Sequence, residues 1–157
     1  MKLTIQTWTD NPLLRAIAKP LKMTELHAQK TLAETMLAYI KNPKHHGIGL
    51  AAPQVGISKR LIVAGLPTYR DEESYPIVIM INPVILSRSE ETDIDEEGCL
   101  SLPGVLKKVE RSIVIEAEWY DISGRKMKKK IVGFGARVVQ HEVDHLDGIL
   151  ISDKSLK

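Results

Sequence analysis

The sequence predicts an α+β domain in which largely antiparallel β-sheets pack around a buried C-terminal helix. Two observations predict this fold class. Apolar residues keep helical spacing near the start and at the end of the chain, and short stretches rich in β-branched residues fill the middle. No repeat or linker-like stretch divides the chain, so residues 1–157 are expected to form a single domain.

Two helices are predicted. The first covers residues 24–40, with Thr24 as its N-cap and Asn42-Pro43 as its stop. The second follows Gly133 and ends at Gly148. The second helix carries three valines and one leucine (Val138, Val139, Val143 and Leu146), which leave little of its surface polar, so it is expected to be buried against the sheet.

The strands are predicted from runs of β-branched residues that are mostly bounded by Gly, Pro, Asp or Asn. Residues 121–124, Asp-Ile-Ser-Gly, are the expected hairpin turn between the last two strands. The expected strands are 59–64, 75–81, 84–87, 106–109, 113–119 and 126–132.

Composition limits the function classes. A net charge of +2 is too small to indicate nucleic acid or an anionic membrane surface as a partner, so neither is expected. The lysines of 126–130 are interpreted as a solvated edge strand rather than a binding patch. Apolar runs such as 77–81 are too short to span a membrane. With a single cysteine, Cys99, and no signal-peptide pattern, a cytoplasmic protein is expected.

Residues 141–145 read His-Glu-Val-Asp-His, an H-E-x-x-H motif. Histidines four apart lie on one helix face, so His141 and His145 can bind one metal ion while Glu142 acts on water bound to it. The alternative is a polar surface helix. The motif predicts metal-assisted hydrolysis but names no substrate.

A catalytic site of this kind usually takes a third protein ligand. Cys99 is the candidate, since a thiolate binds divalent transition metals well and Gly98 removes a side chain beside it. The alternative is an inert buried cysteine. We favour the ligand because the H-E-x-x-H motif accompanies it.

A third segment, residues 47–56, is rich in small side chains and would let another backbone approach closely. The Gln54 amide within it could donate a hydrogen bond to a developing oxyanion. Taken alone, a Gly/Ala-rich turn of this kind more often serves packing. It lacks the phosphate-loop and dinucleotide-binding patterns, so nucleotide binding is not expected.

Taken together, residues 47–54, 97–101 and 140–148 resemble the three signature motifs of peptide deformylases, in the family's order and approximate spacing. Further similar segments are Leu14-Arg15, Asn82-Pro83 and Val109-Glu110-Arg111. The resemblance implies an enzyme that removes the formyl group from the N-terminal formyl-methionine of newly made polypeptides. It also implies one divalent metal ion, Fe²⁺ in the first place, with Zn²⁺, Ni²⁺ or Co²⁺ as substitutes.

The resemblance assigns catalytic roles. It implies that Cys99, His141 and His145 hold the metal. Metal-bound water then attacks the formyl carbon with Glu142 as general base and acid. The oxyanion meets the Gln54 amide and the Leu100 N–H.

The resemblance also suggests how the substrate binds. The segment Ile48-Gly49-Leu50 is expected to pair with it as an added strand. The methionine pocket is expected between Ile48, Phe134, Val138 and His141. Glu97 and Arg111 complete the residues expected at the substrate site. They resemble the pair of residues that supports the metal-binding loop in the family.

Two alternatives remain at the level of the sequence. A zinc metallopeptidase normally has its third ligand downstream of the motif, where this sequence has no His, Glu or Cys. A degenerate protein that binds formyl-peptides or metal without turnover would not need Glu142 and Gln54.

The expected partners are nascent chains near the ribosome, and the expected state is a monomer. The sequence ends soon after Asp153, without the long C-terminal helix of some family members, which puts docking on the ribosome through such a helix in doubt.

Overall fold

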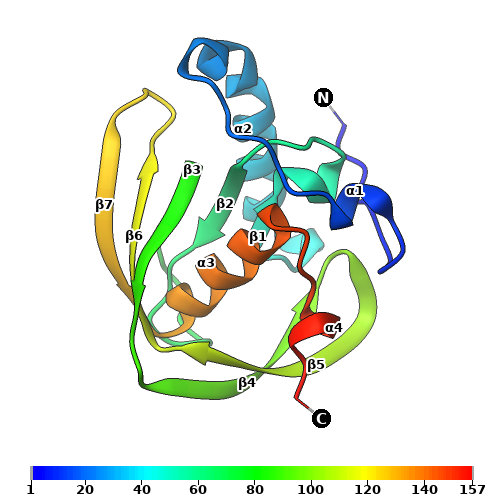
Figure 1. The fold of residues 1–157 in the computed structure, drawn as a ribbon, viewed down its shortest axis with the longest axis vertical. Helices are drawn as coiled ribbons and strands as arrows, with labels where there is room; N and C mark the ends of the chain where they lie inside the picture. The colour runs from blue at the N-terminus through cyan, green and yellow to red at the C-terminus, as the bar shows by residue number, and fades with distance from the viewer. Residues whose placement is uncertain (1, 157) are drawn as a thin grey trace.

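The computed structural model describes residues 2–156 and shows two antiparallel sheets with a long helix near the C-terminus, as predicted (Figure 1). The larger sheet has the order β1-β2-β3-β6-β7 and consists of β1 (Gly49–Ala51), β2 (Leu61–Gly65), β3 (Ile77–Arg88), β6 (Val114–Tyr120) and β7 (Lys126–Val132). The smaller sheet pairs β4 (Thr92–Cys99) with β5 (Leu102–Ser112). The α-helices are α1 (Pro12–Arg15), α2 (Leu26–Lys41), α3 (Gly133–Leu146) and α4 (Ile151–Lys154).

Strand β2 separates two apolar cores. Leu61 and Val63 pack into the core that includes α2, whereas Ile62 and Ala64 pack into the core that includes α3. Successive side chains of a strand point to opposite faces, so α2 and α3 lie on opposite faces of the sheet. This explains why β2 is apolar at every position, because a strand covered on both faces has no polar side.

Helix α3 lies between the five-stranded sheet and the β4–β5 hairpin (Figure 1). Its valines face the sheet, and two of its polar side chains bond to the hairpin. Arg137 donates to the carbonyl of Val109 at 2.8 Å, and Gln140 donates to that of Ser112 at 2.8 Å. The helix is therefore enclosed on both sides, and its H-E-x-x-H residues are held in fixed positions.

The lysine-rich strand β7 is the outer edge of the large sheet. Two of its lysines form cross-strand ion pairs with β6, which we call the lysine ladder: Lys126–Glu118 at 2.9 Å and Lys128–Glu116 at 2.7 Å. An edge strand with exposed lysines resists pairing with other chains. The edge position predicted for this segment is confirmed.

Several segments differ from what the sequence predicts. Thr24 is not the N-cap, because a 3₁₀ turn over Met23–Glu25 precedes α2 and the Glu25 carboxylate accepts from the Lys22 N–H at 2.9 Å. The predicted strands 75–81 and 84–87 form one strand, β3, with a register shift at Asn82-Pro83. No strand is predicted before Cys99, but the acidic stretch there forms β4, so Cys99 is the last residue of a strand.

None of the helices within residues 2–156 combines the length and the apolar character needed to cross a bilayer.

Candidate metal centre and active site

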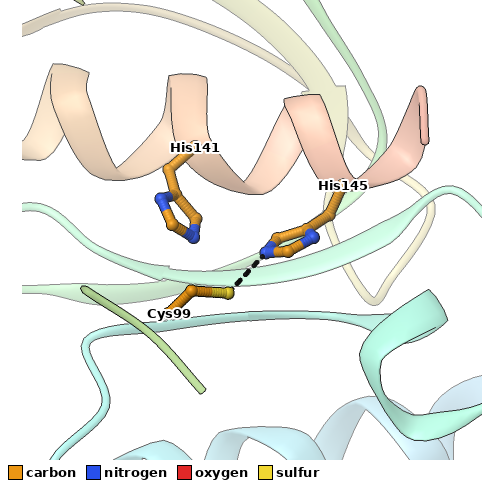
Figure 2. A group of neighbouring side chains, drawn as sticks. All are labelled: Cys99, His141 and His145. Carbon is orange, nitrogen blue, oxygen red and sulfur yellow. Dashed lines mark hydrogen bonds between the residues drawn. The ribbon is translucent and has the colours of Figure 1, made fainter. Parts of the chain in front are cut away.

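Three side chains from two elements converge on one point (Figure 2). His141 and His145 project from one face of α3, and Cys99 comes from the end of β4. One ligand atom from each lies within 4.8 Å of the others, and the Cys99 Sγ is 3.3 Å from the His145 Nε2. A thiolate and two imidazoles this close are a suitable ligand set for a divalent transition metal.

The orientation of His141 is set by Glu97. The Glu97 Oε2 accepts from the His141 Nδ1 at 2.9 Å, which leaves the Nε2 free to face Cys99. Burial opposes a charged His141, but hydrogen bonds with Cys99 and Glu97 raise its pKa well above the ordinary value. A metal ligand must be neutral imidazole, so metal binding at this histidine displaces a proton.

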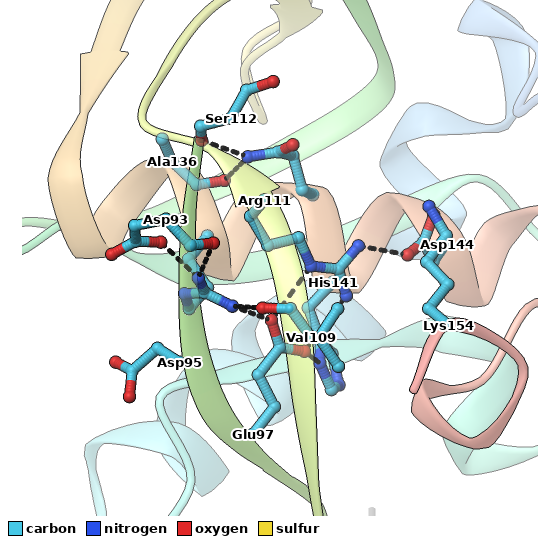
Figure 3. Close-up of polar contacts among 12 residues, drawn as sticks. Asp93, Asp95, Glu97, Val109, Arg111, Ser112, Ala136, His141, Asp144 and Lys154 are labelled. Carbon is cyan, nitrogen blue, oxygen red and sulfur yellow. Dashed lines mark hydrogen bonds and ion pairs between the residues drawn. The ribbon is translucent and has the colours of Figure 1, made fainter. Parts of the chain in front are cut away.

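Glu97 is part of a group that we call the buried charge cluster (Figure 3). Arg111 donates to both Glu97 oxygens at 2.9 and 3.0 Å and to the Asp144 carboxylate at 2.5 Å. Arg137 donates to Glu97 at 2.8 Å. Burial opposes the charge on Glu97, but the hydrogen bonds from His141 and Arg111 hold its pKa well below the ordinary value. The cluster consists of Glu97, Arg111, Arg137, His141 and Asp144.

Glu142 lies beside the ligands and is 4% exposed. Burial raises the pKa of Glu142 to about 7. Its Oε2 has no hydrogen-bond partner among the described residues, so it is a buried carboxylate oxygen available to a bound molecule. A carboxylate with a pKa near neutrality can both accept and return a proton, which is what a general base and acid must do.

Gly49 of β1 makes room for Glu142. A Cβ atom at Gly49 would lie 2.3 Å from the Glu142 Oε1 and 2.9 Å from its Cγ. Any larger residue at this position would therefore push the Glu142 carboxylate out of its place beside Cys99, His141 and His145. This gives the small-residue segment a physical purpose that the sequence alone did not supply.

A hydrogen bond to its amide oxygen fixes the orientation of the Gln54 side chain. Its Oε1 accepts from the Ala51 N–H at 2.9 Å, so its Nε2 faces Ser101 at 3.2 Å and the Cys99 Sγ at 3.7 Å. Gln54 is 1% exposed. A held amide donor beside the ligand atoms has the placement that oxyanion stabilisation requires.

A pocket of about 580 Å³ opens above these groups. Of the residues predicted to bind or process substrate, it is lined by Ile48, Gly49, Gln54, Glu97, Leu100, Phe134, Val138 and Glu142, together with Cys99 and His141. Two predicted substrate-binding residues do not line it, and neither does His145, the third predicted metal ligand. Leu50 is buried in the core around α2, and Arg111 lies in the buried charge cluster. The side chains of these two residues lie outside the pocket and support the residues that line it.

Sequence reasoning missed three residues that the structure brings to the site. Arg137 and Asp144 complete the buried charge cluster, and Arg70 lines the pocket from the segment after β2. Asp144 occupies an x position of the H-E-x-x-H motif, and the motif itself assigns no role to that position. Arg137 and Arg70 carried no spacing signal, because their partners are far away in the sequence.

Comparison with known proteins identifies the family. The family model described as polypeptide deformylase matches residues 3–157. The chain belongs to the peptide deformylase family. Peptide deformylases from Thermotoga maritima and Chlorobaculum parvum are each 41% identical to it, over 92% and 100% of this chain and 82% and 81% of theirs.

Solved peptide deformylases share the fold. One is a class I type b enzyme from Acinetobacter baumannii with Met-Ala-Ser bound, at a TM-score of 0.88 and 36% identity, with 98% of each chain covered. Another is a probable peptide deformylase from Synechococcus phage S-SSM7, at a TM-score of 0.85 and 38% identity, covering 98% of this chain and 99% of that one. The chain is therefore a metal-dependent hydrolase that removes the formyl group from the N-terminus of formyl-methionine peptides.

Proposed function

We propose that residues 1–157 act as one catalytic domain in which Cys99, His141 and His145 hold the metal ion. The convergence of their three ligand atoms within 4.8 Å, beside a buried carboxylate, carries this proposal. Several ions suit one thiolate and two imidazoles. On the family resemblance we propose Fe²⁺, with Zn²⁺, Ni²⁺ or Co²⁺ as substitutes. Such an ion supplies a more acidic water and polarises a carbonyl oxygen.

Glu142 is the proposed general base and acid. With its pKa raised by burial to about 7, its carboxylate accepts the proton of the attacking water and then returns it to the leaving amine. The absence of a side chain at Gly49 and the unpaired Oε2 support this role. The peptide amine leaves as a neutral group, and formate is the second product.

Two donors are proposed to stabilise the oxyanion. The Gln54 Nε2 is directed toward the ligand cluster because its Oε1 is held by the Ala51 N–H. The Leu100 N–H follows Cys99 directly at the end of β4. A donor fixed before the reaction needs no reorganisation when negative charge develops on the formyl oxygen.

The substrate is proposed to bind alongside β1. This strand is the edge of the large sheet opposite β7, and β2 is its only strand partner within residues 2–156. Ile48, Gly49 and Leu50 can therefore accept an extended peptide as an added strand, which reads backbone groups rather than sequence. The methionine side chain is proposed to enter the pocket and to contact the part of its wall formed by Ile48, Phe134 and Val138. The Met-Ala-Ser bound in the A. baumannii relative supports this choice of residue.

In the cell, we propose a cytoplasmic monomer that acts on nascent chains close to the ribosome. A thiolate ligand fits a reducing compartment, where Cys99 stays free of disulfide exchange. A formylated N-terminus is available only while or soon after a chain is made, which places the substrate near the ribosome.

The test is formate release from a formyl-Met tripeptide by protein purified without oxygen, after its metal content has been measured. We expect Glu142→Ala to keep its metal and to lose about 10²–10⁴-fold in kcat. Glu34→Ala is the matched control, because Glu34 is an exposed helical glutamate on α2. Full activity in Glu142→Ala would refute the proton-transfer role, and loss of activity in Glu34→Ala would show that the assay reports folding instead.

A further inference from the structure

Arg70 is held at the wall of the pocket by three neighbours. Its guanidinium carbon lies 4.4 Å from the centre of the Phe134 ring. Its Nε and Nη2 donate to the Asp95 Oδ2 at 3.1 and 2.6 Å, and its Nη2 also donates to the Glu96 carbonyl at 2.7 Å. A planar guanidinium can satisfy all three contacts at once, and lysine could not. The Arg70 head group is therefore fixed although its side chain is 52% exposed.

The pocket runs along α3 from the metal ligands to Phe134. His141, Val138 and Phe134 all line the pocket and follow one another at three- and four-residue spacing on one helix face. His141 lies seven positions after Phe134 on the helix, a rise of about 10 Å. Arg70, stacked on Phe134, thus lies at the end of the pocket far from the metal ligands.

The segment that carries Arg70 is attached to α3 independently of its side chain. The N–H groups of Phe134 and Gly135 donate to the carbonyls of Thr68 at 2.9 Å and Pro67 at 2.6 Å. These carbonyls satisfy donors that a helix N-terminus leaves without intrahelical partners. A Cβ at Gly133 would lie 2.1 Å from the Thr68 oxygen, so glycine is needed for this close approach.

We propose that Arg70 determines specificity by closing the far end of the methionine pocket, so that it limits the length of the first side chain. The inference rests on the proposed function, which assigns this pocket to the first residue of the substrate. A formyl carbon at the metal ligands places the tip of a methionine side chain along α3 toward Phe134. A longer linear side chain then meets the guanidinium, which cannot move aside without breaking its bonds to Asp95 and Glu96.

The test compares two formyl-X-Ala-Ser peptides, with X as norleucine or as 2-aminooctanoic acid, whose linear side chain is two methylenes longer. The readout is the ratio of their kcat/KM values, measured by formate release from the metal-loaded enzyme. The wild type is expected to favour norleucine. Arg70→Ala is expected to raise the relative kcat/KM of the longer peptide about tenfold, because its two additional methylenes can then be buried.

Two further variants complete the test. Asp95→Ala leaves Arg70 in place without its carboxylate partner and is expected to shift the ratio in the same direction by a smaller factor. This variant keeps the inference testable if Arg70→Ala does not fold. Arg125→Ala is the control, since Arg125 is an exposed arginine paired with an aspartate in the β6–β7 turn. Its ratio should equal that of the wild type.

The outcomes separate this inference from the function on which it rests. A ratio within twofold of the wild type in both Arg70→Ala and Asp95→Ala refutes the role of Arg70, as does an equal loss of rate for both peptides. A wild-type enzyme that releases formate from neither norleucine nor methionine peptides refutes the proposed function itself.

Discussion

Ion pairs occupy two contrasting environments in this molecule. In the buried charge cluster, Glu97, Arg111 and Arg137 are 6%, 4% and 3% exposed, and the carboxylate of Glu97 accepts four hydrogen bonds (Figure 3). In the lysine ladder, the side chains of Lys126 and Lys128 are more than half exposed, and each contacts one glutamate across the strand pair. The distances between charged atoms are similar in the two places, so geometry alone does not distinguish them.

The surroundings distinguish them. Water and salt screen the lysine ladder, and an exposed pair of this kind adds little to stability. A buried charge that loses its partner remains desolvated and unpaired, so each member of the buried charge cluster depends on the others. The cluster also includes His141, one of the proposed metal ligands, whereas the ladder contacts no residue of the site. We infer that the cluster orders the active site and that the ladder protects the sheet edge.

Loss of the central carboxylate of the buried charge cluster is expected to reduce folding stability strongly. Glu97→Ala leaves Arg111 and Arg137 without their shared partner and is expected to cost about 3–5 kcal/mol of the free energy of unfolding. For a chain of this length that corresponds to a fall of roughly 10 °C in Tm. Urea denaturation and thermal melting of the metal-loaded protein measure it.

Glu116→Ala is the matched control, since it removes the same side chain from the lysine ladder. A fall in Tm of equal size in both variants would contradict the distinction between the two environments. So would a Glu97→Ala variant as stable as the wild type.

The second expected effect is on metal binding. Glu97→Gln keeps the shape of the side chain but removes the negative charge that orients His141 through its Nδ1. Loss of such a supporting partner typically weakens metal affinity 10–100-fold, and we expect a reduction in this range. Competition with a chelator, followed by metal quantification, measures the change.

Glu110→Gln supplies the control for metal affinity. Glu110 lies on β5 of the same hairpin but is exposed and bonds to Thr92. Unchanged metal affinity in Glu97→Gln would show that the packing of α3 orients His141 without help from the charge.

The two environments also differ in how well the sequence predicts them. The lysine run of β7 correctly predicts an edge strand, because a cluster of lysines within one short strand is a local pattern. The H-E-x-x-H histidines were also visible, since helical periodicity places His141 and His145 on one face. In both cases the interacting residues are close in sequence or follow a regular period.

Only some members of the buried charge cluster can be predicted from the sequence, because its members interact over long sequence separations. Arg137 lies 40 residues from Glu97, and no local pattern links them. Strand β4 was missed for a related reason. Its sequence, Thr-Asp-Ile-Asp-Glu-Glu-Gly-Cys, has low strand propensity, and it becomes a strand because it pairs along its whole length with β5. The buried position of Glu97 follows only from that pairing.

Loss of an ion pair in the lysine ladder is expected to change stability very little. Lys128→Gln removes a charge that contacts Glu116 at 2.7 Å, with the lysine side chain 59% exposed. Because solvent screens the pair and Lys128 has no contact with the site, we expect Tm to change by about 1 °C or less at physiological salt. The kcat/KM for formyl-Met peptides should equal that of the wild type. Melting at low and high salt checks this, since any stabilisation from the pair must shrink as salt screens it. A loss of several degrees that persists at high salt would mean that the ladder supports the packing of β6 and β7, and the contrast with the buried cluster would then be one of degree.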